Sequence, residues 1–184
     1  MRDETDSRSP RASVTDATES LQEKIEALKF KCLFNIALCE DGASHYRKLD
    51  VFKDVVTVVF GLGAVAQIFS SFPVVYSVVG FSVAVLGIVG VVVGFSRRLS
   101  EELSRKGKYE SVRNGLDLVR DECGYADCLN AYAEAEKGEA RSNSVCDAVC
   151  FNIAVDQMGR DPSYKRKVGW LRYYTRHFIP WRME

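Results

Sequence analysis

The sequence predicts an all-α membrane protein, in which a two-helix transmembrane hairpin is flanked by N- and C-terminal cytoplasmic helices. Two observations predict this class. The 25 basic and 25 acidic residues of the 184-residue chain all lie outside Val55–Ser96, a stretch that also lacks histidine. The segments on both sides repeat apolar residues at the three- and four-residue spacing of helices. A charge-free stretch of this length is expected where part of a chain lies in lipid.

Residues 1–19 are polar and hold few large apolar side chains, so we expect a disordered tail. The tail does not resemble a secretory signal, because no apolar core follows its basic residues. Ser20–Glu23 matches a capping box, which predicts a cytoplasmic helix over residues 20–53. The apolar stripe of this helix consists of Leu21, Ile25, Leu28, Cys32, Ile36, Cys39, Ala43 and Tyr46.

Residues 54–96 are predicted to form the hairpin, with spans at 54–72 and 74–95. Each span approaches the length of about 20 residues that a bilayer requires, and Ser70–Pro73 is a turn-prone cluster between them. Valine favours strands in water, but a helix satisfies every backbone group in lipid. The alternative is two buried strands and a buried helix in a soluble core, which this short chain has few polar elements to cover.

The glycines of the first span also match a dinucleotide-binding fingerprint. Gly61–Ala66 reads G-x-G-x-x-A after a valine-rich run. That fold requires a helix with one polar face and an acidic residue about 20 residues further on. Residues 64–82 carry no charge, and Phe81–Val85 contains no acid. The sequence therefore fails both requirements of a nucleotide-binding turn, and the membrane interpretation is preferred.

Small residues in both spans predict close helix packing. In the second span, three glycines recur every seven residues and two form G-x-x-x-G. The spans contain four polar side chains, those of Thr57, Gln67, Ser77 and Ser82. They could line a water path in an oligomer or take part in ordinary packing and hydrogen bonding between helices, and the sequence favours packing. The candidate seam consists of Gly80, Ala84, Gly87, Gly90 and Gly94, with Gly61, Ala64 and Gln67 on the first span.

The basic residues predict the orientation of the hairpin. Arg47, Lys48 and Lys53 precede the first span, Arg97 and Arg98 follow the second, and the turn between the spans has no basic residue. Because basic residues remain on the cytoplasmic side, we expect a multi-pass protein of the cell (inner) membrane with both termini in the cytoplasm.

The C-terminal cytoplasmic region, residues 97–184, is predicted to be helical. The post-membrane helix is expected to continue from the second span to about Gly124, and a short helix follows over 127–137. A third helix is expected to begin near Ser144, where Ser144 and Asp147 are predicted to form the cap, and to stop at Gly159. The post-membrane helix carries a coiled-coil-like seam of Tyr109, Val112, Leu116, Val119 and Cys123.

No enzyme, cofactor or metal is expected. The cysteine pairs Cys123/Cys128 and Cys146/Cys150 lie in helical pattern rather than in zinc-knuckle turns, so we expect small buried residues with free thiols. His45 is expected to be a surface residue rather than a proton sensor.

The tail from Arg160 interleaves basic and aromatic residues. This mixture suits the headgroup zone of a bilayer, and it also occurs in proteins that bind single-stranded nucleic acid. A third alternative is that the tail packs within the cytoplasmic bundle. We expect the membrane role and no nucleic-acid partner, because the chain already contains a membrane hairpin. The candidate interface anchors are Arg97, Arg98, Trp170, Tyr173, Tyr174 and Trp181.

The order of these segments resembles the SLATT family of two-transmembrane effector domains. The resemblance covers residues 21–181 and rests on the lead helix ending in "ASHYRKLDVFK", the tight hairpin and the helix "RRLSEELSRKGKYESVRNGLDLVRDE". The helix "VCDAVCFNIAVDQMG" and the closing "YKRKVGWLRYYTRHF" complete it.

The resemblance implies a membrane effector that oligomerises and permeabilises the bilayer in a prokaryotic nucleotide-signalled anti-phage or conflict system. Its expected partners are the lipid bilayer, further copies of the chain, and a separate nucleotide-sensing or nucleotide-synthase protein. The alternatives are a non-conducting membrane anchor that recruits a cytoplasmic partner, and a phage holin.

Overall fold

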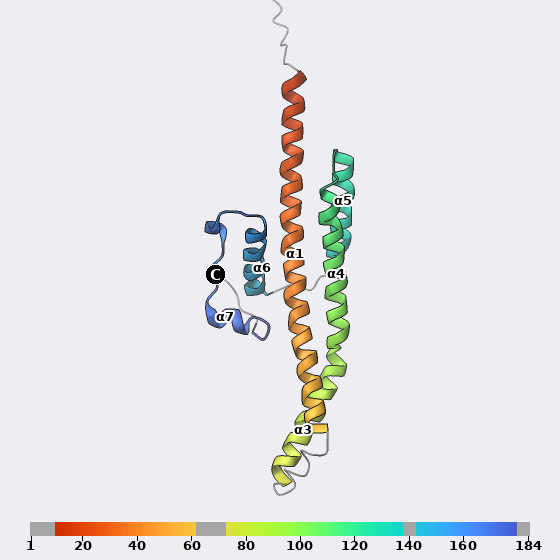
Figure 1. Ribbon diagram of the computed structural model, residues 1–184, viewed down its shortest axis with the longest axis vertical. Helices are drawn as coiled ribbons and strands as arrows, with labels where there is room; N and C mark the ends of the chain where they lie inside the picture. Colours follow the sequence, from red (N-terminus) through yellow and green to blue (C-terminus); the bar gives the residue numbers. More distant parts are fainter. Residues whose placement is uncertain (1–9, 62–72, 138–142, 180–184) are drawn as a thin grey trace, which may run out of the picture.

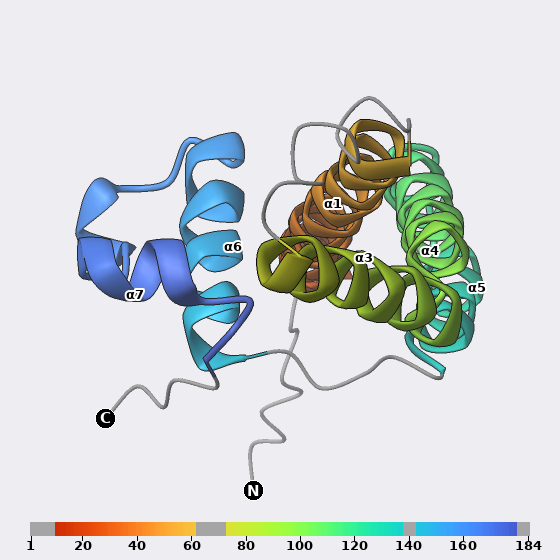
Figure 2. The same cartoon turned by 90° about the horizontal axis from the view of Figure 1, so that it is seen from below.

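The computed structural model describes residues 10–61, 73–137 and 143–179, and within these ranges the chain is helical without a strand. The all-α prediction is confirmed. Figure 1 shows a long helix, α1 (Pro10–Gly61), beside the antiparallel α4 (Phe95–Leu116), with α5 (Glu122–Glu136) folded back along α4. On the other side of α1 lie α6 (Ser144–Gln157), the short 3₁₀-helix η1 (Pro162–Tyr164) and α7 (Trp170–Thr175). Seen from below in Figure 2, α3 (Pro73–Val93) crosses under α1 towards α4.

Helix α1 is a single helix of 52 residues, about 78 Å long at 1.5 Å per residue. The helix start predicted at Ser20 is wrong, since α1 begins at Pro10 and Ser20 lies inside it. Proline suits the first position of a helix, where its missing N–H has no intrahelical role. Between Pro10 and Gly61 the sequence has no further proline and a single glycine, Gly42, so no strong helix breaker stops the helix at the predicted tail or at residue 53.

The main core lies where α1, α4 and α5 meet. The predicted stripe of α1 supplies most of one side. Of the predicted seam, Tyr109, Val112 and Leu116 of α4 line the other side, whereas the prediction is wrong for Cys123, which is exposed on α5. Asn35 is the buried polar residue here, and its amide donates to the Tyr132 hydroxyl at 3.0 Å. That hydroxyl donates in turn to Glu136 at 3.2 Å, so burying the amide leaves no unpaired donor. The core residues are Ile25, Leu28, Cys32, Ile36, Cys39, Tyr109, Val112, Leu116, Tyr132 and Ala135.

The sequence predicts one continuous helix from the second span to Gly124, but the structure interrupts it at Gly94 and again after Leu116. Gly94 separates α3 from α4, with φ 62° and ψ 55°, a left-handed conformation that glycine adopts without steric cost. At the other end α4 stops at Leu116, and the Asp121 carboxylate caps α5 by accepting the Gly124 N–H at 2.8 Å. Gly124 therefore lies in the first turn of a new helix.

Helix α6 begins at its predicted start, Ser144, but the predicted cap of Ser144 with Asp147 is wrong, because Asn143 caps the helix by accepting the Val145 N–H at 2.9 Å. The predicted stop is also confirmed, because Gly159 has φ 61° and its N–H donates to the Asp156 carbonyl. The apolar spacing predicts one buried side formed by Val145, Ala148, Val149, Ile153 and Met158, and of these Val145 and Ala148 are buried. Ile153 is exposed, whereas the small residues Ala148, Cys150 and Ala154 are fully buried.

Candidate membrane-facing surface

The last turns of α1 and most of α3 expose large apolar side chains, and we call this surface the apolar belt. One described stretch, Gly80–Leu116, contains an 18-residue window long and apolar enough to cross a membrane, and 7% of that window is buried. The belt consists of Val51, Phe52, Val55, Val58, Val59, Val74, Val78, Phe81, Val85, Ile88, Val89 and Val92.

The exposure of the belt excludes the alternative of a soluble core for its described residues. Residues 55–61 are helical, not a strand, and the side chains of Val58 and Phe81 are 58% and 73% exposed. A dinucleotide-binding turn also needs a strand where α1 is helical. Soluble monomers rarely expose a contiguous apolar patch of this kind, so the belt needs a cover of lipid or protein.

Part of the predicted small-residue seam is open. A Cβ atom added at Gly80 or at Gly87 would meet nothing within 4 Å, and Ala84 between them is exposed. These three positions lie within a narrow arc of α3, so a second helix can approach its backbone there. Gly61 is the last residue of α1, and the predicted seam residues Ala64 and Gln67 lie outside the described residues.

The other two glycines of the seam are used within the chain itself. Gly90 is buried, and a Cβ there would lie 2.5 Å from Cδ of Lys53 on α1. The prediction that Gly94 continues the seam is wrong, because its left-handed backbone ends α3. Thr57 and Ser82 are exposed, and each hydroxyl donates to a carbonyl four residues earlier in its own helix, at 2.8 Å, so both hydroxyl donors are satisfied within the helix.

Helices α1, α3 and α4 meet at a polar joint next to Gly94. Lys53 lies over Gly90 and donates to Asp50 at 2.8 Å, and Ser96 on α4 donates to the other Asp50 oxygen at 2.9 Å. The lysine stem contacts α3 while its ammonium group remains with carboxylates, as expected for a lysine at the edge of an apolar region. The joint therefore fixes the angle between α3 and α4.

Replacement of Gly94 by alanine should strain this joint. A side chain at φ 62° costs about 1–2 kcal/mol, so Gly94→Ala should lower the free energy of unfolding by that amount. Gly107→Ala is the control, because Gly107 is exposed inside α4 with open space around it. That change should raise the free energy by about 0.5–1 kcal/mol. Chemical unfolding in mild detergent measures both, and effects of the same sign would contradict this reading of the joint.

The predicted interface anchors lie on both sides of α1. Arg97 and Arg98 are exposed at the start of α4, just after the belt, and Arg97 pairs with Glu101 at 2.9 Å. Trp170 and Tyr174 are exposed on α7, and Tyr173 less so. Figure 2 shows α7 and α4 on opposite sides of α1. Trp181 lies outside the described residues.

A charged cluster, the C-terminal clasp, fastens the segment after α7 to α1. Both oxygens of Asp41 accept from Arg176, at 2.5 and 3.2 Å, and the His177 Nε2 lies 3.2 Å from Asp41. Burial opposes ionisation of Asp41, but the hydrogen bonds from His177 and Arg176 outweigh it and hold the pKa of this carboxyl well below its usual range. The His45 ring stacks on His177 with centroids 4.2 Å apart. Contrary to prediction, His45 is thus half-buried.

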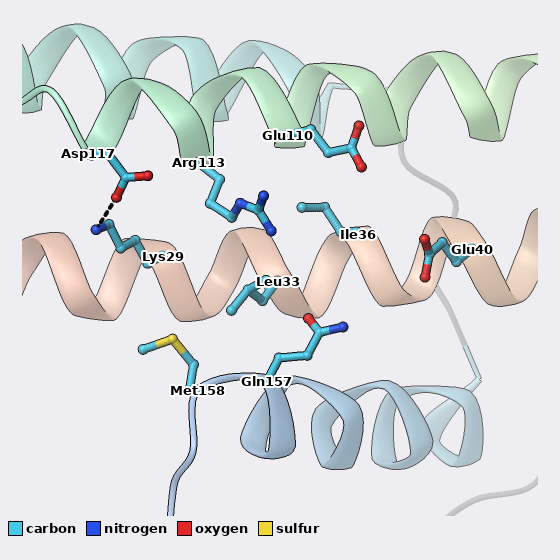
Figure 3. Close-up of a pocket in the computed structure, with 9 residues that line it drawn as sticks. All are labelled: Lys29, Leu33, Ile36, Glu40, Glu110, Arg113, Asp117, Gln157 and Met158. Atoms are coloured by element: carbon cyan, nitrogen blue, oxygen red, sulfur yellow. Dashed lines mark hydrogen bonds and ion pairs between the residues drawn. The ribbon is translucent and has the colours of Figure 1, made fainter.

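A groove of about 420 Å³ lies between α1, α4 and α6 in the part of the chain remote from the belt (Figure 3). Lys29 closes one end by donating to Asp117 at 2.5 Å, and the guanidinium of Arg113 points into the groove beside Ile36. Its charges are mixed, because acids and bases from α1 and α4 both line it. Nothing in the sequence pattern indicated this groove, since its walls come from three helices far apart in the chain.

The two cysteine pairs lie on opposite sides of α1. Cys128 belongs to α5, while Cys146 and Cys150 are buried on α6, and Figure 1 places these helices apart. The pairs therefore do not form one four-thiolate site.

No family model, curated protein or solved structure matches the chain.

Proposed function

We propose that this protein is a membrane effector that oligomerises through α3 and permeabilises the cell (inner) membrane, with both termini in the cytoplasm. In this proposal the two apolar segments form the transmembrane hairpin, and the protein acts in a prokaryotic nucleotide-signalled anti-phage or conflict system, as the SLATT resemblance implies. The single observation that carries the proposal is the apolar belt, which is exposed although it is the most apolar part of the chain.

The open small residues support oligomerisation. In lipid, apolar burial does not drive helices together, so association depends on close packing at small side chains. Gly80, Ala84 and Gly87 provide such a face on α3, and no other part of the described chain covers the two glycines.

The joint beside Gly94 supports a mechanism for opening. At the polar joint, Lys53 of α1 lies over Gly90 of α3, and Asp50 accepts hydrogen bonds from Lys53 and from Ser96 of α4. A signal that shifts α1 against α4 changes the direction of α3 at Gly94. Neighbouring α3 helices then repack along their small residues, and a path opens between subunits.

Leakage from liposomes tests this function. The reconstituted full-length chain should release an entrapped dye, in the oligomeric or ligand-triggered state. Gly87→Leu should reduce the leak about tenfold, because bulk at the open face blocks the close approach of a second helix on which association in lipid depends.

Val78→Leu is the matched control. It also adds bulk to an exposed position of α3, but it lies about 200° around the helix from Gly80, and its leak should remain at the wild-type level. Absence of leak in every oligomeric and triggered state of the wild-type chain would count decisively against the effector.

The groove of Figure 3 favours a second candidate function, a non-conducting anchor whose cytoplasmic helices recruit a partner. The two functions separate in one exchange experiment. If residues 54–96 are replaced by two unrelated apolar spans, an anchor keeps its activity and a pore loses it.

A further inference from the structure

Three side chains of metal-binding type converge beside the C-terminal clasp. Asp41 comes from α1, Cys146 from α6 and His177 from the turn after α7. Their ligand atoms all lie within 4.8 Å of one another, and the Asp41 and His177 atoms are 3.2 Å apart. Cys146 is 8% exposed, and the Asp41 and His177 side chains are 15% and 19% exposed.

This ligand set has the chemistry of a zinc site. Zn²⁺ accepts thiolate, imidazole and carboxylate ligands in tetrahedral geometry, and sites with three protein ligands hold water in the fourth position. Ligand atoms on one zinc ion lie about 3.2–3.8 Å apart, given bonds of about 2.0–2.3 Å. The Asp41–His177 pair already has this separation, and the other pairs of ligand atoms lie within 4.8 Å of each other.

Outer groups hold the ligands in place. Arg176 donates to both Asp41 oxygens, at 2.5 and 3.2 Å, and its guanidinium lies over the Tyr173 ring. Asn143 donates to the Arg176 and Ile179 carbonyls at 3.1 and 2.7 Å, which fixes the backbone on both sides of His177. Such second partners orient metal ligands and raise affinity.

The ion pairs of the clasp do not explain the position of Cys146. Its Sγ lies 4.0 Å from the Arg176 carbonyl. A bound dication displaces the thiol proton of Cys146 to solvent and binds the thiolate. The Asp41 carboxylate and this thiolate then supply two negative charges, and the Arg176 guanidinium adds one positive charge beside Asp41.

We propose that Asp41, Cys146 and His177 bind a zinc-class divalent ion that fastens the C-terminal segment to α1 and α6. The site is independent of pore formation, since it lies in the cytoplasmic part and uses no residue of the apolar belt.

Cobalt binding tests the site in the full-length chain, purified in detergent and stripped with a chelator. One equivalent of Co²⁺ should produce a near-ultraviolet thiolate-to-cobalt band and the intense visible absorption of tetrahedral coordination. Zn²⁺ should displace the cobalt and raise the Tm of the wild-type chain. Cys146→Ala should abolish the thiolate band, and Arg176→Gln should weaken affinity about 10- to 100-fold.

Cys150→Ala is the matched control, because Cys150 is a fully buried thiol one turn further along α6. It should leave the thiolate band unchanged, and circular dichroism checks the folding of each variant. Failure of the wild-type chain to give the thiolate band overturns the proposal whether or not the variants fold. A band that survives Cys146→Ala, or that disappears in Cys150→Ala, also overturns it.

Discussion

Phe81→Asp is expected to release the protein from the membrane fraction. Phe81 is 73% exposed near the middle of α3, within the apolar belt. A charged residue at the centre of a membrane helix costs about 2.5–3.5 kcal/mol on insertion scales. The ratio of membrane-bound to soluble protein should therefore fall about 100-fold. Fractionation of cells expressing the variant, followed by alkaline extraction of the membranes, measures this ratio.

Leu129→Asp provides the matched comparison for that experiment. Leu129 is also an exposed apolar residue, 43% exposed, but it lies on α5 and outside the belt. The same charge there should leave the distribution at the wild-type ratio. An equal shift in both variants would show that loss of solubility or folding, rather than insertion, controls the distribution.

Tyr109→Ala is expected to cause the largest loss of stability in the bundle formed by α1, α4 and α5. The Tyr109 side chain is fully buried between α1 and α5, and its ring packs on that of Tyr132 with centroids 5.7 Å apart. Truncation of a buried aromatic residue typically costs about 3–5 kcal/mol, because a cavity remains. Denaturation in mild detergent, followed by circular dichroism, should show a decrease of this size in the free energy of unfolding.

Tyr164→Ala makes the same chemical change at an exposed site. Tyr164 is 66% exposed in η1, and such surface changes usually remain within about 0.5 kcal/mol. Similar losses in both variants would contradict the placement of Tyr109 in the core.

The stripe of α1 could be predicted because helix periodicity is a local signal. The three- and four-residue spacing of Ile25, Leu28 and Cys32 places them on one face of any helix, and that face forms the core. The face of α6 could be predicted only in part. Val145 and Ala148 are buried as predicted, but Cys150 and Ala154, which the predicted side did not include, are also buried, while the larger Ile153 is exposed.

The two glycine roles also could not be separated by sequence. Gly87 and Gly94 share the seven-residue repeat, yet one lies on an open helical face and the other ends the helix with a positive φ. A glycine permits both conformations equally, so only the surrounding structure decides between them.

The C-terminal clasp had no local signal at all. Asp41 and Arg176 are 135 residues apart, and neither belongs to a recognisable motif. Each residue looks like a surface charge in its own segment, and only the packing of α6 and α7 on α1 brings them together. Long-range polar clusters of this kind depend on tertiary structure.

Depth-resolved tryptophan quenching tests the central claim, that α3 lies in the bilayer. The chain has 2 tryptophans, and Trp170→Phe with Trp181→Phe provides a background without either. Val85→Trp in this background places a single tryptophan in the belt, and Leu129→Trp places one on α5. In vesicles of lipids brominated deep in the acyl chains, the Val85→Trp protein should be strongly quenched and shielded from aqueous iodide, while the Leu129→Trp protein should show the reverse. Iodide quenching of both proteins, with no quenching of either by the lipids, would contradict the account.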